Sequence, residues 1–159
     1  MDGHEHLFIL GRGPCEAIAK EGALKIKEVS YIHAEGYIAG AFKHGPIAMI
    51  DDLSQTRFIL LITKQDSNKL EKTLEQVKAR NAFTIVITDC LSDLNPNAID
   101  LAIEIPSAGW LSPLLCVFPL QLLSYELAVR RGKNPDKPRH LAKEVTVKWL
   151  TYIIYLNMQ

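Results

Sequence analysis

Residues 57–88 read RFILLITKQDSNKLEKTLEQVKARNAFTIVIT and decide the fold class. The two ends of this stretch, Arg57–Thr63 and Thr84–Thr88, are continuous apolar runs, as is typical of strands buried on both faces of a sheet. Between them, Ser67–Arg80 has the amphipathic pattern of a helix. A helix that joins two buried strands predicts a βαβ unit with parallel strands.

Apolar positions and likely boundary residues define this central helix more closely. Leu70, Leu74 and Val77 share one face, and Ser67 is expected to cap the first turn. Asp89 follows the second strand and is expected to end it. The central unit therefore has one buried helix face and two strands inside a sheet.

The same alternation continues on both sides of the central unit. Leu7–Leu10 is expected to be a strand, followed by a helix from Cys15 to about Tyr31. Leu101–Ile105 is expected to be a further strand, and Leu114–Arg131 a long helix that ends at Gly132. We therefore predict an α/β protein with a mainly parallel sheet, whose ligands sit at the carboxyl ends of the strands.

Length and charge limit the possible functions. The chain has 159 residues, enough for one compact domain, and its 18 Lys and Arg balance its 18 Asp and Glu. A net charge of zero argues against nucleic acid or an anionic membrane as a partner. The apolar region Trp110–Leu123 is shorter than a membrane span, and Met1–His6 does not open a signal peptide. We expect a cytoplasmic protein.

The three cysteines, Cys15, Cys90 and Cys116, lie far apart in the sequence. They form no CxxC pair and have no histidine at a metal-ligand spacing. We therefore expect reduced thiols, as in a cytosolic protein, with no metal and no cofactor.

The glycine-rich stretch "LGRGP", residues 10–14, invites comparison with dinucleotide-binding turns. It lacks the third glycine of GxGxxG, because Cys15 and Glu16 follow instead. This stretch could be a plain strand-to-helix turn. It fits about equally well a turn that directs backbone N–H groups at an anion.

Three charged residues lie where apolar ones are expected. On a helical wheel of Cys15–Tyr31, Glu21, Lys25 and Glu28 fall inside the apolar arc, and their spacing allows them to pair. Burial of an unpaired charge costs roughly several kcal/mol. Two explanations fit this pattern equally well. The three residues could form a structural ion network, or they could line a pocket with a carboxylate base and an ammonium group.

Two histidine segments offer candidates for proton transfer. His44 precedes Gly45 and Pro46, which restrict the backbone after it and suggest a positioned histidine. His33 and Glu35 could form a second pair, although "HAEG" equally suits a polar helix end.

The C-terminal segment "PRHLAKEV" contains two cations four residues apart. Arg139 and Lys143 would face the same way on one helical turn, which suits an anionic or carbonyl substrate, and a lysine of lowered pKa can form a Schiff base. A solvated basic turn explains the same pattern and is the commoner case.

Several segments occur together in one order: "GRG", "EGALKIKEVSYIHAEGYIAG", "KHGP", "PLQLLSYELAV" and "PRHLAKEVTV". From about Leu7 to Val147 the chain resembles the second sugar isomerase (SIS) domain of the glutamine:fructose-6-phosphate amidotransferase family. The resemblance implies a flavodoxin-like three-layer sandwich with about five parallel strands. It also implies a cytosolic homodimer or larger assembly in amino-sugar biosynthesis, acting on fructose 6-phosphate and glucosamine 6-phosphate.

The resemblance also implies roles for matching residues. Glu28 matches the base that moves a proton between C1 and C2 of the sugar, and Lys143 the lysine that forms a Schiff base. Lys25 matches a pocket lysine, and His44 the ring-opening histidine that reaches into the neighbouring subunit's site. Ala142 and Arg139 lie on the matching tail, which closes over the sugar.

The chain also departs from the family pattern. The glutaminase domain and the first SIS domain, whose Ser/Thr-rich loop holds the sugar phosphate, have no counterpart in it. The equivalent loop "TKQDSNK" carries Asp66, which would repel a phosphate. Ala41 and His140 replace the usual acidic residue and asparagine. We expect one SIS domain over residues 1–148 and an atypical apolar extension at 149–159.

Three functions remain open on this basis. The chain could be half of an isomerase module that acts only with the missing SIS domain. It could instead be a sugar-phosphate-binding module without turnover, or a single-domain phosphosugar isomerase completed by dimerisation.

Overall fold

The computed structural model describes residues 6–50 and 56–140. Its centre is a five-stranded sheet in the order β2-β1-β3-β4-β5, and every neighbouring pair is parallel. The strands are β1 (His6–Gly11), β2 (His33–Ile38), β3 (Arg57–Ile62), β4 (Phe83–Thr88) and β5 (Leu101–Glu104). This is the flavodoxin-like order, so the expected fold class is confirmed.

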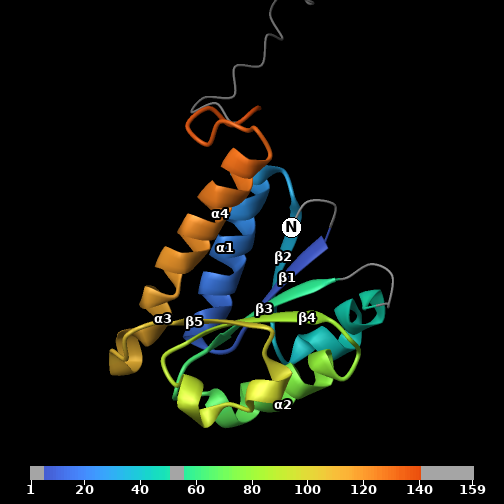
Figure 1. Cartoon of the computed structure of the whole chain (residues 1–159), viewed down its shortest axis with the longest axis vertical. Coiled ribbons are helices and arrows are strands. Elements are labelled where there is room, and N and C mark those ends of the chain that lie inside the picture. Colours follow the sequence, from blue (N-terminus) through green and yellow to red (C-terminus); the bar gives the residue numbers. More distant parts are fainter. Residues whose placement is uncertain (1–5, 51–55, 141–159) are drawn as a thin grey trace, which may run out of the picture.

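Helices cover both faces of the sheet and make three layers (Figure 1). On one face α1 packs against α4; α2 lies on the other. The helices are α1 (Pro14–Ser30), α2 (Ser67–Lys78), α3 (Ser112–Leu115) and α4 (Val117–Arg130). Five short 3₁₀ turns complete the described elements: η1 (Ala41–His44), η2 (Pro46–Met49), η3 (Leu91–Asp93), η4 (Pro96–Ala98) and η5 (Gly109–Leu111).

The continuous apolar runs in the strands supply two separate cores. In β1, Leu7 and Ile9 pack into the core beneath α1 and α4, whereas Phe8 and Leu10 pack into the core beneath α2. Successive side chains of a strand point to opposite faces, so a strand covered on both sides must be apolar at every position.

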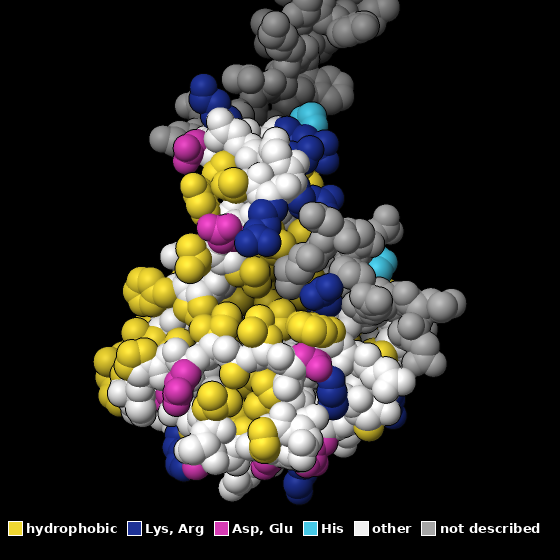
Figure 2. Space-filling model, viewed as in Figure 1, with side chains coloured by type: hydrophobic (Ala, Val, Ile, Leu, Met, Phe, Trp, Pro, Cys, Tyr) yellow, Lys and Arg dark blue, Asp and Glu magenta, His cyan; other side chains and the backbone are white. Residues whose placement is uncertain are grey.

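The edge strand β5 departs from this rule. Leu101 is 48% exposed, and no residue of β5 is fully buried. A groove of about 380 Å³ runs between β5 and α4, lined in part by Ile103, Leu122 and Leu123. Apolar side chains form a broad patch in this part of the surface (Figure 2). The apolar run Leu101–Ile105 resembles those of β3 and β4, but β5 is not covered on both faces as they are.

The C-terminal helical stretch is apolar and interrupted. By length and composition alone, Gly109–Arg130 could cross a membrane, but 39% of its apolar window is buried in the fold. Leu120 and Ala128 are buried, and α4 packs along α1, as a core helix does. The expected single helix is broken at Cys116, because Pro119 has no N–H to donate to the carbonyl of Leu115.

Two further expectations need correction. Residues 33–38 form strand β2 rather than a polar helix end; its polar composition hid it among the apolar strands. Ser67 does not cap α2, because Asp66 occupies the N-cap position and the Ser67 hydroxyl donates to the carbonyl oxygen of Lys64 at 3.2 Å. Gly132 does follow α4 with a φ of 65°, as expected for a glycine that ends a helix.

Asp100 joins β4 to the start of β5 and gives a testable acid dependence of stability. Its carboxylate accepts from the Thr84 N–H at 2.8 Å and from Lys78 Nζ at 2.5 Å. Burial opposes its ionisation, but the Lys78 and Thr84 hydrogen bonds together prevail and lower the pKa of Asp100. Its stabilisation should therefore be complete above the unfolded-state pKa, near 4, and be lost as pH falls through the lower folded-state pKa.

We expect Asp100→Asn to reduce the free energy of unfolding by about 1–3 kcal/mol at pH 7, because hydrogen bonds to a charged group are lost. Urea unfolding at pH 7 and pH 3 measures this difference. The gap between variant and parent should shrink at the lower pH. A constant gap would show that Asp100 does not act through its charge.

Candidate functional site

The charged residues on α1 form one network. Lys25 Nζ lies 2.8 Å from Glu28 Oε2 and 3.7 Å from Glu21 Oε1. The expected pairing is therefore confirmed. Their side chains are 25% exposed for Glu28, 38% for Lys25 and 46% for Glu21. The network is thus less buried than the helical wheel predicted. Leu24, which lies on the same arc of α1, is also exposed.

The charges of this network support one another. The hydrogen bond to Glu28 raises the pKa of Lys25 above its ordinary value, and the negative charges of Glu28 and Glu21 add to the effect. Lys25 is therefore an ammonium ion at neutral pH. The Glu28 side chain is half-buried, with the Lys25 ammonium group 2.8 Å away.

The network lies at the end of the sheet opposite to the one expected. Helix α1 ends at Ser30, and β2 begins at His33, which pairs with His6 at the start of β1. Glu28 therefore lies at the amino ends of these parallel strands. The network therefore does not lie at the carboxyl ends of the strands, where ligands of such sheets are expected.

Tyr31 brings the C-terminal segment to this end of α1. Its hydroxyl accepts the Arg139 backbone N–H at 2.8 Å, and the Arg139 guanidinium lies 4.2 Å from the centre of its ring. Lys133 Nζ lies over the same ring at 5.9 Å. Tyr31 caps α1 with a φ of 59°, and sequence reasoning did not single it out. Its only signal was an aromatic residue at the end of the charged helix.

His44 is not near this network within one chain. It is exposed on η1, which follows the carboxyl end of β2, whereas Glu28 precedes the amino end of that strand. A six-residue strand spans about 17–20 Å, so the two residues lie at opposite ends of the sheet. The possible pair His33 and Glu35 does form, with Nε2 and Oε1 3.4 Å apart.

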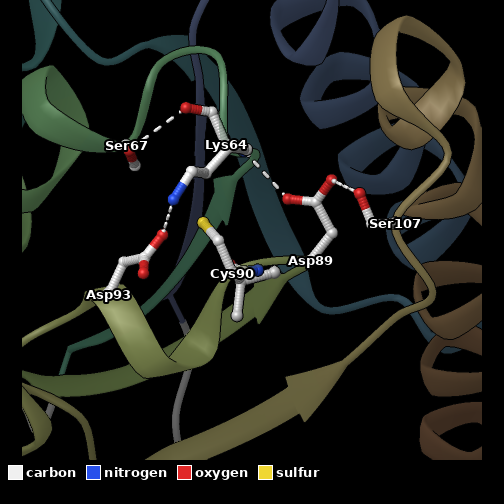
Figure 3. A network of polar contacts seen from close by, with 7 residues as sticks. Lys64, Ser67, Asp89, Cys90, Asp93 and Ser107 are labelled. Atoms are coloured by element: carbon white, nitrogen blue, oxygen red, sulfur yellow. Dashed lines mark hydrogen bonds and ion pairs between the residues drawn. The ribbon is translucent and has the colours of Figure 1, made fainter.

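Acidic groups hold the loop after β3. The Lys64 backbone N–H donates to Asp89 Oδ1 at 2.9 Å, and its side chain pairs with Asp93 (Figure 3). Asp66 pairs with Arg12 at 3.2 Å. A Cβ built on Gly13 would lie 3.5 Å from Asp66 Oδ2, so the chain's own carboxylate sits beside the "GRGP" turn.

Among the described residues, no group of three or more His, Cys, Asp or Glu side chains could hold a metal ion. Cys15, Cys90 and Cys116 are all buried and unpaired by disulfides. Ala142 and Lys143, two of the expected site residues, and the extension at 149–159 lie outside the described residues.

The fold and this arrangement can be compared with known proteins. The SIS domain family matches residues 2–131. The chain belongs to the SIS domain family. This SIS domain is 49% identical, over 145 residues, to the glutamine–fructose-6-phosphate aminotransferase (isomerizing) of Pyrobaculum aerophilum, covering 89% of the chain and 23% of that protein. A probable enzyme of the same name from Acanthamoeba polyphaga mimivirus is 46% identical over 150 residues, covering 93% of the chain and 24% of that protein.

A solved structure gives the same assignment. The C-terminal domain of glucosamine-fructose-6-phosphate aminotransferase from Francisella tularensis superposes with a TM-score of 0.77 at 36% identity. The match covers 85% of this SIS domain and 38% of that chain. The tagatose-6-phosphate ketose/aldose isomerase of Escherichia coli shares the fold, with a TM-score of 0.73 at 18% identity, over 92% of this chain and 41% of that one. The chain spans about a quarter of the length of the relatives from Pyrobaculum aerophilum and the mimivirus.

Proposed function

We propose that this SIS domain is the C-terminal half of the isomerase module of a glucosamine-6-phosphate synthase. That enzyme would use fructose 6-phosphate and glutamine-derived ammonia to make glucosamine 6-phosphate. The observation that carries the proposal is the 49% identity along 89% of the chain to an aminotransferase of this kind. Such identity supports a common reaction more strongly than the shared fold does.

Glu28 is the proposed base. Its carboxylate would take a proton from C1 of the open-chain sugar and return it at C2, while Lys25 stabilises the negative charge that develops near the sugar hydroxyls. The Lys25–Glu28 contact of 2.8 Å supports this division of roles. The positions come from the resemblance, and the geometry supplies a carboxylate and an ammonium group side by side.

The anchored position of Arg139 supports a role for the C-terminal segment. Arg139 stacks on Tyr31, and Tyr31 follows Glu28 by three residues in the chain. Lys143 follows Arg139 by four residues in the sequence. We propose that Lys143 forms the Schiff base with the ketose, and that Ala142 and Arg139 contact the sugar.

His44 would act in a neighbouring subunit. The opposite ends of β2 separate it from Glu28, so one chain does not bring the two residues together. A homo-oligomer in which η1 of one subunit faces α1 of another would do so. The proposed ring-opening role of His44 therefore depends on such an assembly.

The acidic loop after β3 supports the expectation that the sugar phosphate is held elsewhere. Asp66 belongs to this loop, and Asp89 and Asp93 bind its Lys64; carboxylates would repel a phosphate. We propose that a first SIS domain, outside this chain, supplies the phosphate site.

A chimera tests this proposal directly. The SIS domain would replace the 145-residue matching segment of the Pyrobaculum aerophilum relative, and glucosamine 6-phosphate formation would be measured. Activity within the parent's range would support the proposal. A folded chimera without activity would overturn it. Interconversion of fructose 6-phosphate and glucose 6-phosphate by the isolated chain would instead favour a single-domain isomerase.

A further inference from the structure

A cavity of about 250 Å³ lies at the carboxyl ends of β1 and β2, away from Glu28. Arg12 follows β1 and Gly40 follows β2, while α2 forms the opposite wall. In this strand order the chain leaves β1 toward β2 on one side and reaches β3 on the other, so the reversal point lies between β1 and β3, next to this cavity. Open α/β sheets bind ligands in the crevice at that point.

Among the residues that the structure describes, every charged one that lines this cavity is a cation. They are Arg12 from the turn after β1, Lys43 from η1, and Lys69 and Lys72 from α2. Thr73 and Gln76 add neutral polar groups and, with Lys69 and Lys72, occupy one face of α2, because residues three and four apart are neighbours on a helix. The cavity therefore combines four positive charges with hydrogen-bonding groups.

Three of these cations have no ion-pair partner among residues 6–50 and 56–140. Arg12 is paired with Asp66 at 3.2 Å, whereas Lys43, Lys69 and Lys72 make no ion pair with any described residue. Of the two acidic residues of α2, Glu71 accepts from the Asn95 N–H at 3.1 Å, and Glu75 makes no ion pair with a described residue. The cavity is thus lined by three lysines that make no ion pair within the described part of the chain.

We propose that this cavity binds the terminal diphosphate group of a small metabolite. One phosphate monoester carries about 1.5–2 negative charges at neutral pH, and a terminal diphosphate carries roughly one more, which matches three cations more closely. A volume of about 250 Å³ is below the usual range of about 300–1,000 Å³ for a ligand site. It suits the diphosphate rather than the whole molecule. This site is independent of the proposed catalytic site.

Calorimetric titration of the full chain with inorganic pyrophosphate at low ionic strength tests the proposal. We expect saturable 1:1 binding, tighter than that of inorganic phosphate. The double variant Lys69→Gln/Lys72→Gln should bind pyrophosphate at least about tenfold more weakly, because two charge-assisted contacts are lost. Lys27→Gln/Lys137→Gln is the matched control; it removes two exposed lysines outside the cavity and should leave affinity unchanged.

Competition separates this site from the proposed catalytic site. Excess fructose 6-phosphate should not displace pyrophosphate, and Glu28→Gln should not alter its affinity. The proposal is overturned by absence of saturable binding, by equal weakening in the control variant, or by displacement with fructose 6-phosphate. None of these results bears on the chimera's synthesis of glucosamine 6-phosphate, so the two proposals fail separately.

Discussion

Replacing Glu28 by glutamine should lower the rate of glucosamine 6-phosphate formation by the chimera about 10²–10⁴-fold, the usual contribution of a positioned acid–base group. In the parent chain Lys25 Nζ donates to Glu28 Oε2 at 2.8 Å. Glutamine retains the shape of the side chain and can still accept this hydrogen bond. It cannot take up the sugar proton. The loss should therefore fall mainly on kcat, with the Michaelis constant for fructose 6-phosphate little changed.

Glu21→Gln is the matched control for this experiment. Glu21 also faces Lys25, at the longer distance of 3.7 Å, and its side chain is 46% exposed. Its removal should change the rate by about threefold or less, as for ordinary surface substitutions. Equal losses in both variants would show that the network acts only by supporting structure, and normal activity in Glu28→Gln would remove Glu28 from the catalytic role.

Gly11→Ala should prevent stable folding or lower the free energy of unfolding by about 3 kcal/mol or more, at or beyond the usual upper end for overpacking. A Cβ on Gly11 would lie 2.1 Å from the carbonyl oxygen of Cys15 and 2.4 Å from its carbonyl carbon. These are backbone atoms in the first turn of α1, so they cannot move away as a flexible side chain would. Relief requires α1 to shift against the end of β1.

The stability of this variant can be measured by thermal unfolding followed by circular dichroism. For a domain of this size the expected loss corresponds to a melting temperature lower by about 6–12 °C or more. Gly40→Ala is the control, because a Cβ there would meet no atom within 4 Å and its φ is −66°. An unchanged melting temperature for Gly11→Ala would contradict the close approach of α1 to β1.

Much of the fold could be read from local patterns. The apolar runs that became β1, β3 and β4 are continuous because each strand is covered on both faces, and this requirement is visible residue by residue. β2 was missed because its central residues, Glu35 and Gly36, do not give an apolar run. Its place in the sheet depends on hydrogen bonds to β1, which involve the backbone and leave little trace in the sequence.

The candidate site was predicted in part. Spacing on α1 was sufficient to predict that Lys25 pairs with Glu21 and Glu28, because residues three and four apart meet on any helix. Their degree of burial was overestimated, since a wheel shows which residues share a side but not how closely a neighbouring helix covers it. The contact between Tyr31 and Arg139, 108 residues apart, has no local signature at all.

The sequence by itself determined the α/β class, the main helices and strands, the family and the ion network on α1. Each of these depends on short-range periodicity or on the identity of matching segments. Only the tertiary structure decided that Glu28 and His44 lie at opposite ends of the sheet, that Tyr31 contacts Arg139, and that lysines from η1 and α2 converge on one cavity. These contacts join residues distant in the chain, and their geometry is set by how helices pack across the sheet rather than by local sequence.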